Sequence, residues 1–163
     1  AAPGGYVLIT RGLYELLSTD SELAAALAHE ISHCVQRDHY NVIHKQEMAD
    51  TAKERALSQV TTGNDTTAGR YARRYAEEHG AAIMLTSLDR DAEYRADVGA
   101  EVYLARAGMN PLALYSLLQK LTALGSESAS LAQLYKTHPP LAARVDRIDQ
   151  RGYGALEAYT ARE

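Results

Sequence analysis

The chain has 163 residues, 46% of them hydrophobic, and a formal net charge of −4, which fits one globular domain with a buried core. Its acidic balance does not suggest a nucleic-acid partner. The lone cysteine, Cys34, excludes an internal disulfide. No apolar run approaches the roughly 18 residues that an integral membrane span needs. We therefore expect residues 1–163 to form a single domain that binds no nucleic acid and does not cross a membrane.

One short strand is expected near the start of the chain. Residues 6–10, YVLIT, are apolar and β-prone, and they follow the turn-forming Gly4 and Gly5. The chain opens abruptly just before this strand, which suggests a piece of a longer precursor. Almost everything after the strand has a helical pattern, so the expected fold is mainly α, with a small β-sheet.

A short helix is expected over residues 11–18, and a long helix follows it. Thr19 and Glu22 have the spacing of a capping box, which marks the start of the long helix. Apolar residues then repeat at four-residue spacing, at Leu23, Leu27, Ile31 and Val35. This stripe predicts the helix face that packs into the core.

Two breaks of small residues, 61–69 and 125–130, divide the rest of the chain. The helices expected around them cover residues 42–60, 70–86, 89–107 and 111–124. Gly108 predicts the end of the helix over 89–107. A last helix is expected after Pro139-Pro140, with Leu141, Val145 and Ile148 on its inner face.

The stretch AHEISH holds two histidines four residues apart, with a glutamate directly after the first. On a helix, His29 and His33 project from one face and can bind one ion between them, while Glu30 lies about 100° further round the axis. Imidazole nitrogens suit zinc, and a carboxylate beside the ion can act as general base. The pattern predicts one Zn²⁺ per chain with Glu30 catalytic. The helical pattern around the motif weakens the alternative, two histidines on a surface helix.

A hydrolytic zinc site needs a third protein ligand and an open position for water. Glu93 and Asp97 are again four residues apart on a predicted helix, so both project from one face. Glu93 could complete the ligand set, and Asp97 could accept a hydrogen bond from the free nitrogen of a ligating histidine. Spacing alone leaves a second interpretation open, in which both are solvated charges beside Arg90 and Arg95.

Four sequence blocks, which together span nearly the whole chain, occur in the order PGGYVLITRGL, ELAAALAHEISHCVQRDH, EYRADVGAEVYLARAGMNP and THPPLAARVDRI. In this order they resemble the HtpX/BepA-like and CaaX-prenyl-protease-like zinc metallopeptidases. The resemblance implies a gluzincin catalytic domain over residues 1–163, helical with a small β-sheet whose edge strand lies near the active site. It also implies that Glu93 is the third zinc ligand, and it places the family aspartate at Asp97.

The resemblance extends to two further regions. It implies that an edge strand near the metal, here Gly5, Tyr6 and Val7, pairs with the substrate backbone; the alternative is a plain edge strand. His138 lies in a segment that is near the active-site cleft in the family. It could donate to the oxyanion of the transition state, occupy the open zinc position as a latch, or only start a helix. Arg144 matches the family arginine, and it either binds a carboxylate or the substrate chain, or forms a structural ion pair.

The predicted function is that of a zinc metalloendopeptidase, which hydrolyses protein and peptide substrates through a metal-activated water in protein quality control. The alternative is a zinc-stabilised chaperone or assembly factor with latent or little proteolytic activity. The intact Glu30 argues against it, because a structural zinc site needs no base. A different metal-dependent hydrolase is a weaker option. The resemblance implies the bacterial cell envelope or periplasm as location, and it leaves peripheral membrane association open.

Overall fold

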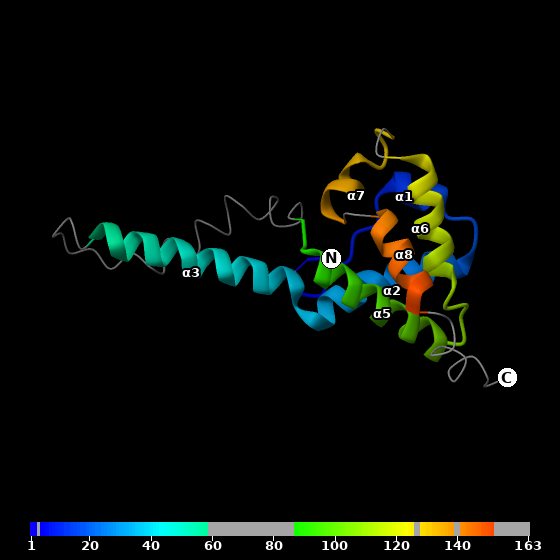
Figure 1. Cartoon of the computed structure of the whole chain (residues 1–163), viewed down its shortest axis with the longest axis horizontal. Helices are drawn as coiled ribbons and strands as arrows, with labels where there is room; N and C mark the ends of the chain where they lie inside the picture. The colour runs from blue at the N-terminus through cyan, green and yellow to red at the C-terminus, as the bar shows by residue number, and fades with distance from the viewer. Residues whose placement is uncertain (3, 59–86, 126–127, 139–140, 152–163) are drawn as a thin grey trace.

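The structure is a computed structural model that describes residues 1–2, 4–58, 87–125, 128–138 and 141–151. Within these ranges the chain forms seven helices: α1 (Arg11–Leu16), α2 (Asp20–Gln36), α3 (Asp38–Ser58), α5 (Arg90–Arg106), α6 (Ala113–Leu124), α7 (Ala132–Thr137) and α8 (Leu141–Arg151). Figure 1 shows α3 projecting from a body that the other helices form. The described part of the chain is therefore mainly α, as predicted. The loop expected at 61–69 and the helix expected at 70–86 lie outside the described residues.

The segment expected to form a strand, residues 6–10, joins no sheet in the part of the chain that the structure describes. It contributes one isolated antiparallel bridge, between Ala2 and Tyr6, with a backbone N–O distance of 2.8 Å. Gly4 and Gly5, with φ of 93° and 83°, turn the chain between these two residues. A β-prone sequence forms a strand only where a partner satisfies its backbone groups. Within the described ranges no such partner strand is present, so the expected small sheet is not seen there.

Small residues bring α2 and α5 close together along their length. Ala25 of α2 and Ala96 and Ala100 of α5 have no exposed surface. Gly99 of α5 faces Ser32 of α2 so closely that a Cβ at position 99 would lie 2.2 Å from the Ser32 Oγ. The two histidines of the H-E-x-x-H motif lie on this same face of α2. The close packing therefore places them directly against α5.

The apolar stripe predicted to anchor α2 in the core does not do so over most of its length. Leu27, Ile31 and Val35 are 36%, 46% and 64% exposed. The four-residue repeat is helical, but the prediction of the buried face is wrong. Branched side chains on the inner face would separate α2 from α5, so alanine and serine occupy that face instead.

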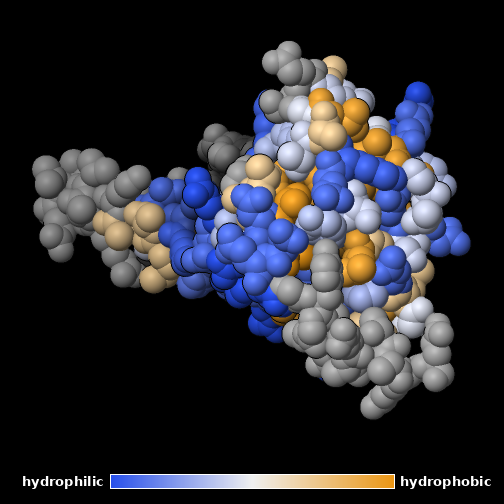
Figure 2. All heavy atoms as spheres, turned by 45° about the vertical axis from the view of Figure 1, so that its right-hand side comes forward, coloured by the Kyte–Doolittle hydropathy of each residue, from blue (hydrophilic) through white to orange (hydrophobic). Residues whose placement is uncertain are grey.

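The hydrophobic core forms where α6 packs against α8 on one side and against α2 on another. Four leucines of α6 at helical spacing are at most 3% exposed: Leu114, Leu117, Leu118 and Leu121. Leu141 and Ile148 of α8 are buried against them, as predicted. On the face shown in Figure 2, hydrophobic residues show in separate patches between polar ones over the helical body, and the part of α3 beside it is hydrophilic. None of the described helices combines the length and hydrophobicity needed to cross a membrane.

Side-chain caps fix the helices that carry the site. Thr19 Oγ1 accepts a hydrogen bond from the Glu22 backbone N–H at 3.1 Å, which confirms the predicted start of α2. The Glu22 carboxylate reaches back to the backbone N–H of Ser18 at 2.7 Å. Asp89 caps α5 in the same way. Gly108, with a φ of 70°, follows the end of α5 as predicted.

Candidate metal centre

Two helices present the predicted metal ligands to one another. His29 and His33 lie on consecutive turns of α2, and Glu93 lies in the first turn of α5. The two histidine Nε2 atoms are 3.0 Å apart. Each is 3.4 Å from a carboxylate oxygen of Glu93. All three side chains are at most 5% exposed, so the structure brings the three residues together in a buried cluster.

The donor atoms of this cluster fit one small divalent cation. Donors that surround zinc tetrahedrally at about 2.0–2.2 Å lie about 3.3 Å from one another. The measured separations between the three donors are 3.0 to 3.4 Å. Two imidazoles and a carboxylate are also a donor set of catalytic zinc sites. The geometry and the chemistry of the residues present therefore both suit zinc.

An aspartate holds the other ring nitrogen of each histidine. His29 Nδ1 lies 3.0 Å from Asp97 Oδ1, and His33 Nδ1 lies 2.9 Å from Asp38 Oδ2. A ring that donates from Nδ1 leaves its Nε2 lone pair free for a metal ion, so both contacts favour the ligating tautomer. Asp97 thus stands beside His29 at the partner position that the sequence analysis suggests for it.

Asp38 is a residue of the site that sequence reasoning does not find. It begins α3, and Arg37 immediately before it ends α2 in the left-handed conformation, with a φ of 57°. This reversal returns the chain toward His33, where no helical spacing would place an aspartate. Arg95 of α5 holds the other Asp38 oxygen, with its Nη2 at 3.2 Å. The only sequence signal is an acidic residue shortly after the motif.

We expect Asp38→Asn to weaken zinc binding by about 10- to 100-fold, since an uncharged partner holds the His33 ring less firmly. Competition with a chromophoric chelator measures the affinity. Asp20→Asn is the matched control, because Asp20 is an exposed acid in the first turn of α2, as Asp38 is a buried acid in the first turn of α3. Equal affinities in the two variants would show that Asp38 does not support the site.

Arg144 of α8 closes the inner side of the cluster. It is 3% exposed. Its Nη2 and Nε donate to the two oxygens of Asp97 at 2.6 and 2.9 Å, and its Nη1 lies 2.9 Å from Glu93 Oε2. Burial opposes the ionisation of Asp97, but Arg144 and His29 outweigh it and lower the Asp97 pKa. These contacts match the ion-pair interpretation of Arg144, and its binding to substrate stays a prediction.

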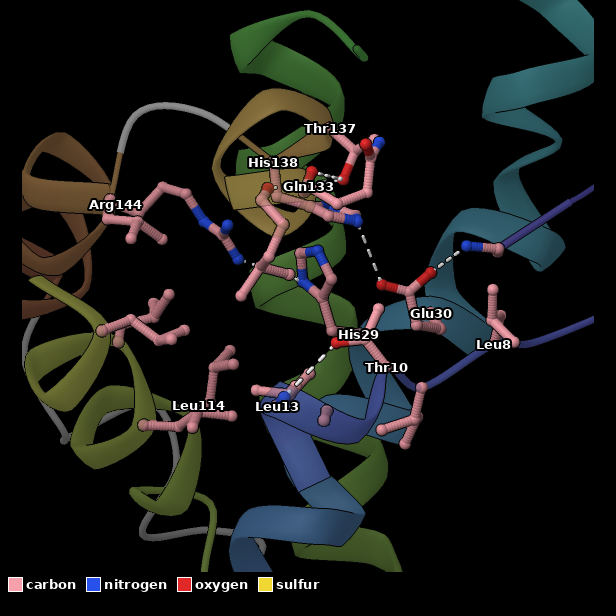
Figure 3. Close-up of a pocket in the computed structure, with 18 of the residues that line it drawn as sticks. Leu8, Thr10, Leu13, His29, Glu30, Leu114, Gln133, Thr137, His138 and Arg144 are labelled. Atoms are coloured by element: carbon pink, nitrogen blue, oxygen red, sulfur yellow. Dashed lines mark hydrogen bonds and ion pairs between the residues drawn. The ribbon is translucent and has the colours of Figure 1, made fainter. Parts of the chain in front are cut away.

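Glu30 lies beside the three candidate ligands and faces the same space. Its Oε1 is 3.3 Å from His138 Nε2, and Figure 3 shows the two side chains pointing toward one another. Burial favours the neutral acid, but His138, His29 and the Ala1 amino group, which forms an ion pair with Glu30, outweigh it and lower the Glu30 pKa to about 2. Glu30 is therefore a carboxylate at neutral pH, which is the form that accepts a proton.

His138 follows α7 and points into the cluster. Its Nδ1 lies 3.0 Å from Glu93 Oε1, and the residue is 8% exposed. The donor atoms of His29, His33, Glu93 and His138 all lie within 4.8 Å of one another. Burial lowers the His138 pKa despite the neighbouring carboxylates. The imidazole has the position of a fourth ligand and also of a hydrogen-bond donor, so the geometry does not decide between the predicted roles.

The residues predicted to pair with substrate lie at the edge of the site. Gly5 lines a hollow of about 320 Å³ together with His33. Tyr6 is 71% exposed, and Val7 is half-buried. The structure thus brings Gly5 near the candidate ligand His33. Pairing between these residues and a peptide stays a prediction.

Two buried histidines and a glutamate that fit one metal ion, with a second glutamate beside them, define a candidate metallohydrolase centre on a helical domain. The model of peptidase family M48 matches residues 1–152. The chain therefore belongs to peptidase family M48, which confirms the resemblance inferred from the four sequence blocks.

Curated relatives of the chain carry the names of proteases. It is 33% identical to a "Protease HtpX homolog" of Desulfatibacillum aliphaticivorans over 87% of this chain and 54% of that protein. It is 30% identical to a "Beta-barrel assembly-enhancing protease" of Yersinia pestis and 28% identical to one of Escherichia coli strain K12, in each case over 83% of this chain and 28% of the relative. The chain thus spans about half of the first relative and just over a quarter of the others. No solved structure matches it.

Proposed function

We propose that residues 1–163 form a single catalytic domain of a zinc-dependent endopeptidase. Membership of family M48 and the protease names of the relatives support a metalloprotease. The observation that carries the proposal is the convergence of His29, His33 and Glu93 on one point, with Glu30 facing the same space. A purely structural zinc site would need no ionised carboxylate at that place.

The residues around the point have distinct roles in the proposed reaction. Zinc bound by His29, His33 and Glu93 would lower the pKa of water toward 7 and polarise the scissile carbonyl. Glu30, held as a carboxylate, accepts a proton from the attacking water and passes it to the amine that leaves. Asp97 fixes the orientation of the His29 ring, so that the ligands need not rearrange during the reaction.

The substrate is proposed to be a polypeptide that lies along residues 5–7. The support is that Gly5 lines the hollow next to His33 and that this segment belongs to no sheet within the described ranges. Its backbone can then pair with an extended peptide, a mode of binding that tolerates many sequences. The small β-sheet expected near the metal would, in the same proposal, form between this segment and the bound peptide.

The resemblance to envelope proteases supports a role in protein quality control at the bacterial cell envelope or periplasm. Peripheral association with a membrane is part of this proposal. The second candidate function, a zinc-stabilised chaperone or assembly factor, is favoured by one observation. His138 lies close enough to the three ligands to occupy the fourth position, which would keep the site latent.

The test measures zinc content and casein cleavage for the unmodified protein, for His138→Ala and for His44→Ala, which changes an exposed histidine of α3. We expect one zinc per chain and cleavage that a chelator abolishes and zinc restores. Faster cleavage by His138→Ala would identify a latch, and slower cleavage would identify help in the transition state.

Zinc-loaded proteins that never cleave casein or peptides would contradict the endopeptidase. Suppression of client aggregation would then support the chaperone, and turnover of non-peptide esters would support another hydrolase.

A further inference from the structure

A cavity of about 350 Å³ opens beside Glu30 and continues into the helical body. His29, Glu30 and His138 form its polar end. Figure 3 shows Leu13 and Leu114 on one side of it and His138 and Glu30 on another. Most of its wall is apolar, and the leucines that contribute include Leu13, Leu114, Leu117, Leu118, Leu121 and Leu134. These side chains come from α1, α6 and α7, so residues far apart in the sequence build one continuous apolar surface.

The size and position of the cavity restrict what can enter it. Its volume lies near the lower end of the range of about 300–1,000 Å³ for ligand sites, which suits one or two side chains. Because its polar end is the candidate metal centre, an occupant must place a polar group near Glu30 and an apolar group among the leucines. A peptide does this when its scissile bond lies at Glu30 and a neighbouring side chain enters the cavity.

Gln133 of α7 supplies an independent polar signal on the cavity wall. Its side-chain Nε2 is buried, and no hydrogen-bond partner for it exists among the described residues. A buried amide N–H without a partner is costly, so such a group calls for an acceptor. A peptide that inserts an apolar side chain carries backbone carbonyl oxygens next to that side chain, and these are acceptors of the required kind.

We propose that the cavity receives an apolar substrate side chain of the size of leucine or phenylalanine, next to the scissile bond, and that Gln133 donates a hydrogen bond to the backbone of the same segment. This inference rests on the proposed endopeptidase function and adds the class of substrate. Large apolar residues are mostly buried in folded proteins. The cavity would therefore select segments that unfolding exposes.

Peptide binding tests the proposal without requiring cleavage. The chain contains no tryptophan, so the fluorescence of a tryptophan placed at the end of a peptide reports binding directly. The zinc-loaded Glu30→Gln protein is titrated with peptides that differ at one position, which carries Leu, Phe, Ala or Asp. We expect the Leu and Phe peptides to bind at least about tenfold more tightly than the Ala and Asp peptides. Equal affinities across the series would overturn the proposal.

Variants of the wall show whether the cavity causes the preference. Leu114→Ala should enlarge the cavity and shift the preference from Leu toward Phe, and Leu114→Met should leave it nearly unchanged. Leu104→Ala is the matched control, because Leu104 is as buried as Leu114, at 2% exposed, but does not line the cavity. Gln133→Leu should weaken the binding of the Leu and Phe peptides by a common factor of about ten, without changing which of them binds more tightly. An order of preference that Leu114→Ala leaves unchanged would contradict the proposal, and thermal unfolding checks that each variant folds.

Cleavage of the same peptides by the unmodified, zinc-loaded protein separates the two proposals. Preferential binding without any cleavage would contradict the endopeptidase and keep the cavity as a binding site for apolar segments. Cleavage with no preference at the varied position would keep the endopeptidase and contradict the role of the cavity.

Discussion

Glu30→Gln is expected to bind zinc as the unmodified protein does and to lose casein cleavage by a factor of about 10² to 10⁴. The amide has almost the same shape as the carboxylate, so the buried surroundings of position 30 should tolerate it. It cannot accept the proton of the attacking water, and it carries no charge. Zinc should remain because the converging donors come from His29, His33 and Glu93, none of which this change removes.

The measurement combines the metal content of the purified protein with the initial rate of cleavage at saturating zinc. Glu15→Gln serves as the control, since Glu15 is an exposed glutamate of α1 whose described partner is Arg11. It should leave both zinc and rate unchanged. Full activity in Glu30→Gln would contradict the proposed mechanism. Loss of zinc from that variant would instead show that Glu30 belongs to the ligand set.

The candidate centre could be predicted to the extent that its geometry is local. A four-residue step places two side chains on one face of any helix, so the pairs His29–His33 and Glu93–Asp97 could be recognised within each helix. Their meeting could not be derived from spacing, because it depends on the close packing of α2 against α5. The resemblance to a metallopeptidase family supplied that link, and the structure places the two pairs in contact.

The features that sequence reasoning misses depend on contacts between distant segments. Asp38 reaches His33 because the backbone reverses at Arg37, which is in the left-handed conformation. Glycine usually marks that conformation in a sequence, and an arginine does not. The exposed face of α2 could not be read from hydrophobicity alone. The close approach of α2 and α5 decides which face of α2 is buried. Gly99 permits that approach, but its role can be recognised only once Ser32 is known to lie opposite it. The strand expected at 6–10 likewise depends on a partner that its own sequence cannot reveal.

Arg144→Met is expected to lower the free energy of unfolding of the metal-free protein by about 3–5 kcal/mol, the range for breaking a buried ion pair on one side. Arg144 contacts the carboxylates of both Glu93 and Asp97 at 2.6 to 2.9 Å. Methionine retains most of the side-chain length but leaves two buried negative charges without their cation. Hydrogen bonds from His138, His29 and His33 lower the pKa of Glu93, and these contacts remain in the variant. Asp97 loses Arg144, the largest of the causes that lower its pKa, but keeps its hydrogen bond with His29.

Zinc should restore part of the stability that Arg144→Met loses, and this distinguishes a structural from a substrate-binding role. A divalent cation bound by Glu93 compensates one of the two charges that the variant leaves unpaired, so the loss in urea unfolding should be smaller with zinc than without it. Arg147→Met is the control on the same helix, because Arg147 is exposed and stacks over the Tyr94 ring at 4.3 Å. Arg147→Met should lower the free energy of unfolding much less, and by the same amount with and without zinc. If Arg144 instead binds substrate, Arg144→Met would raise KM while its unfolding resembles that of Arg147→Met. The buried contacts of Arg144 with Glu93 and Asp97 of α5 favour the structural role. In that role Arg144 holds the proposed ligand Glu93 in place before a metal ion binds, together with Asp97, the partner of His29.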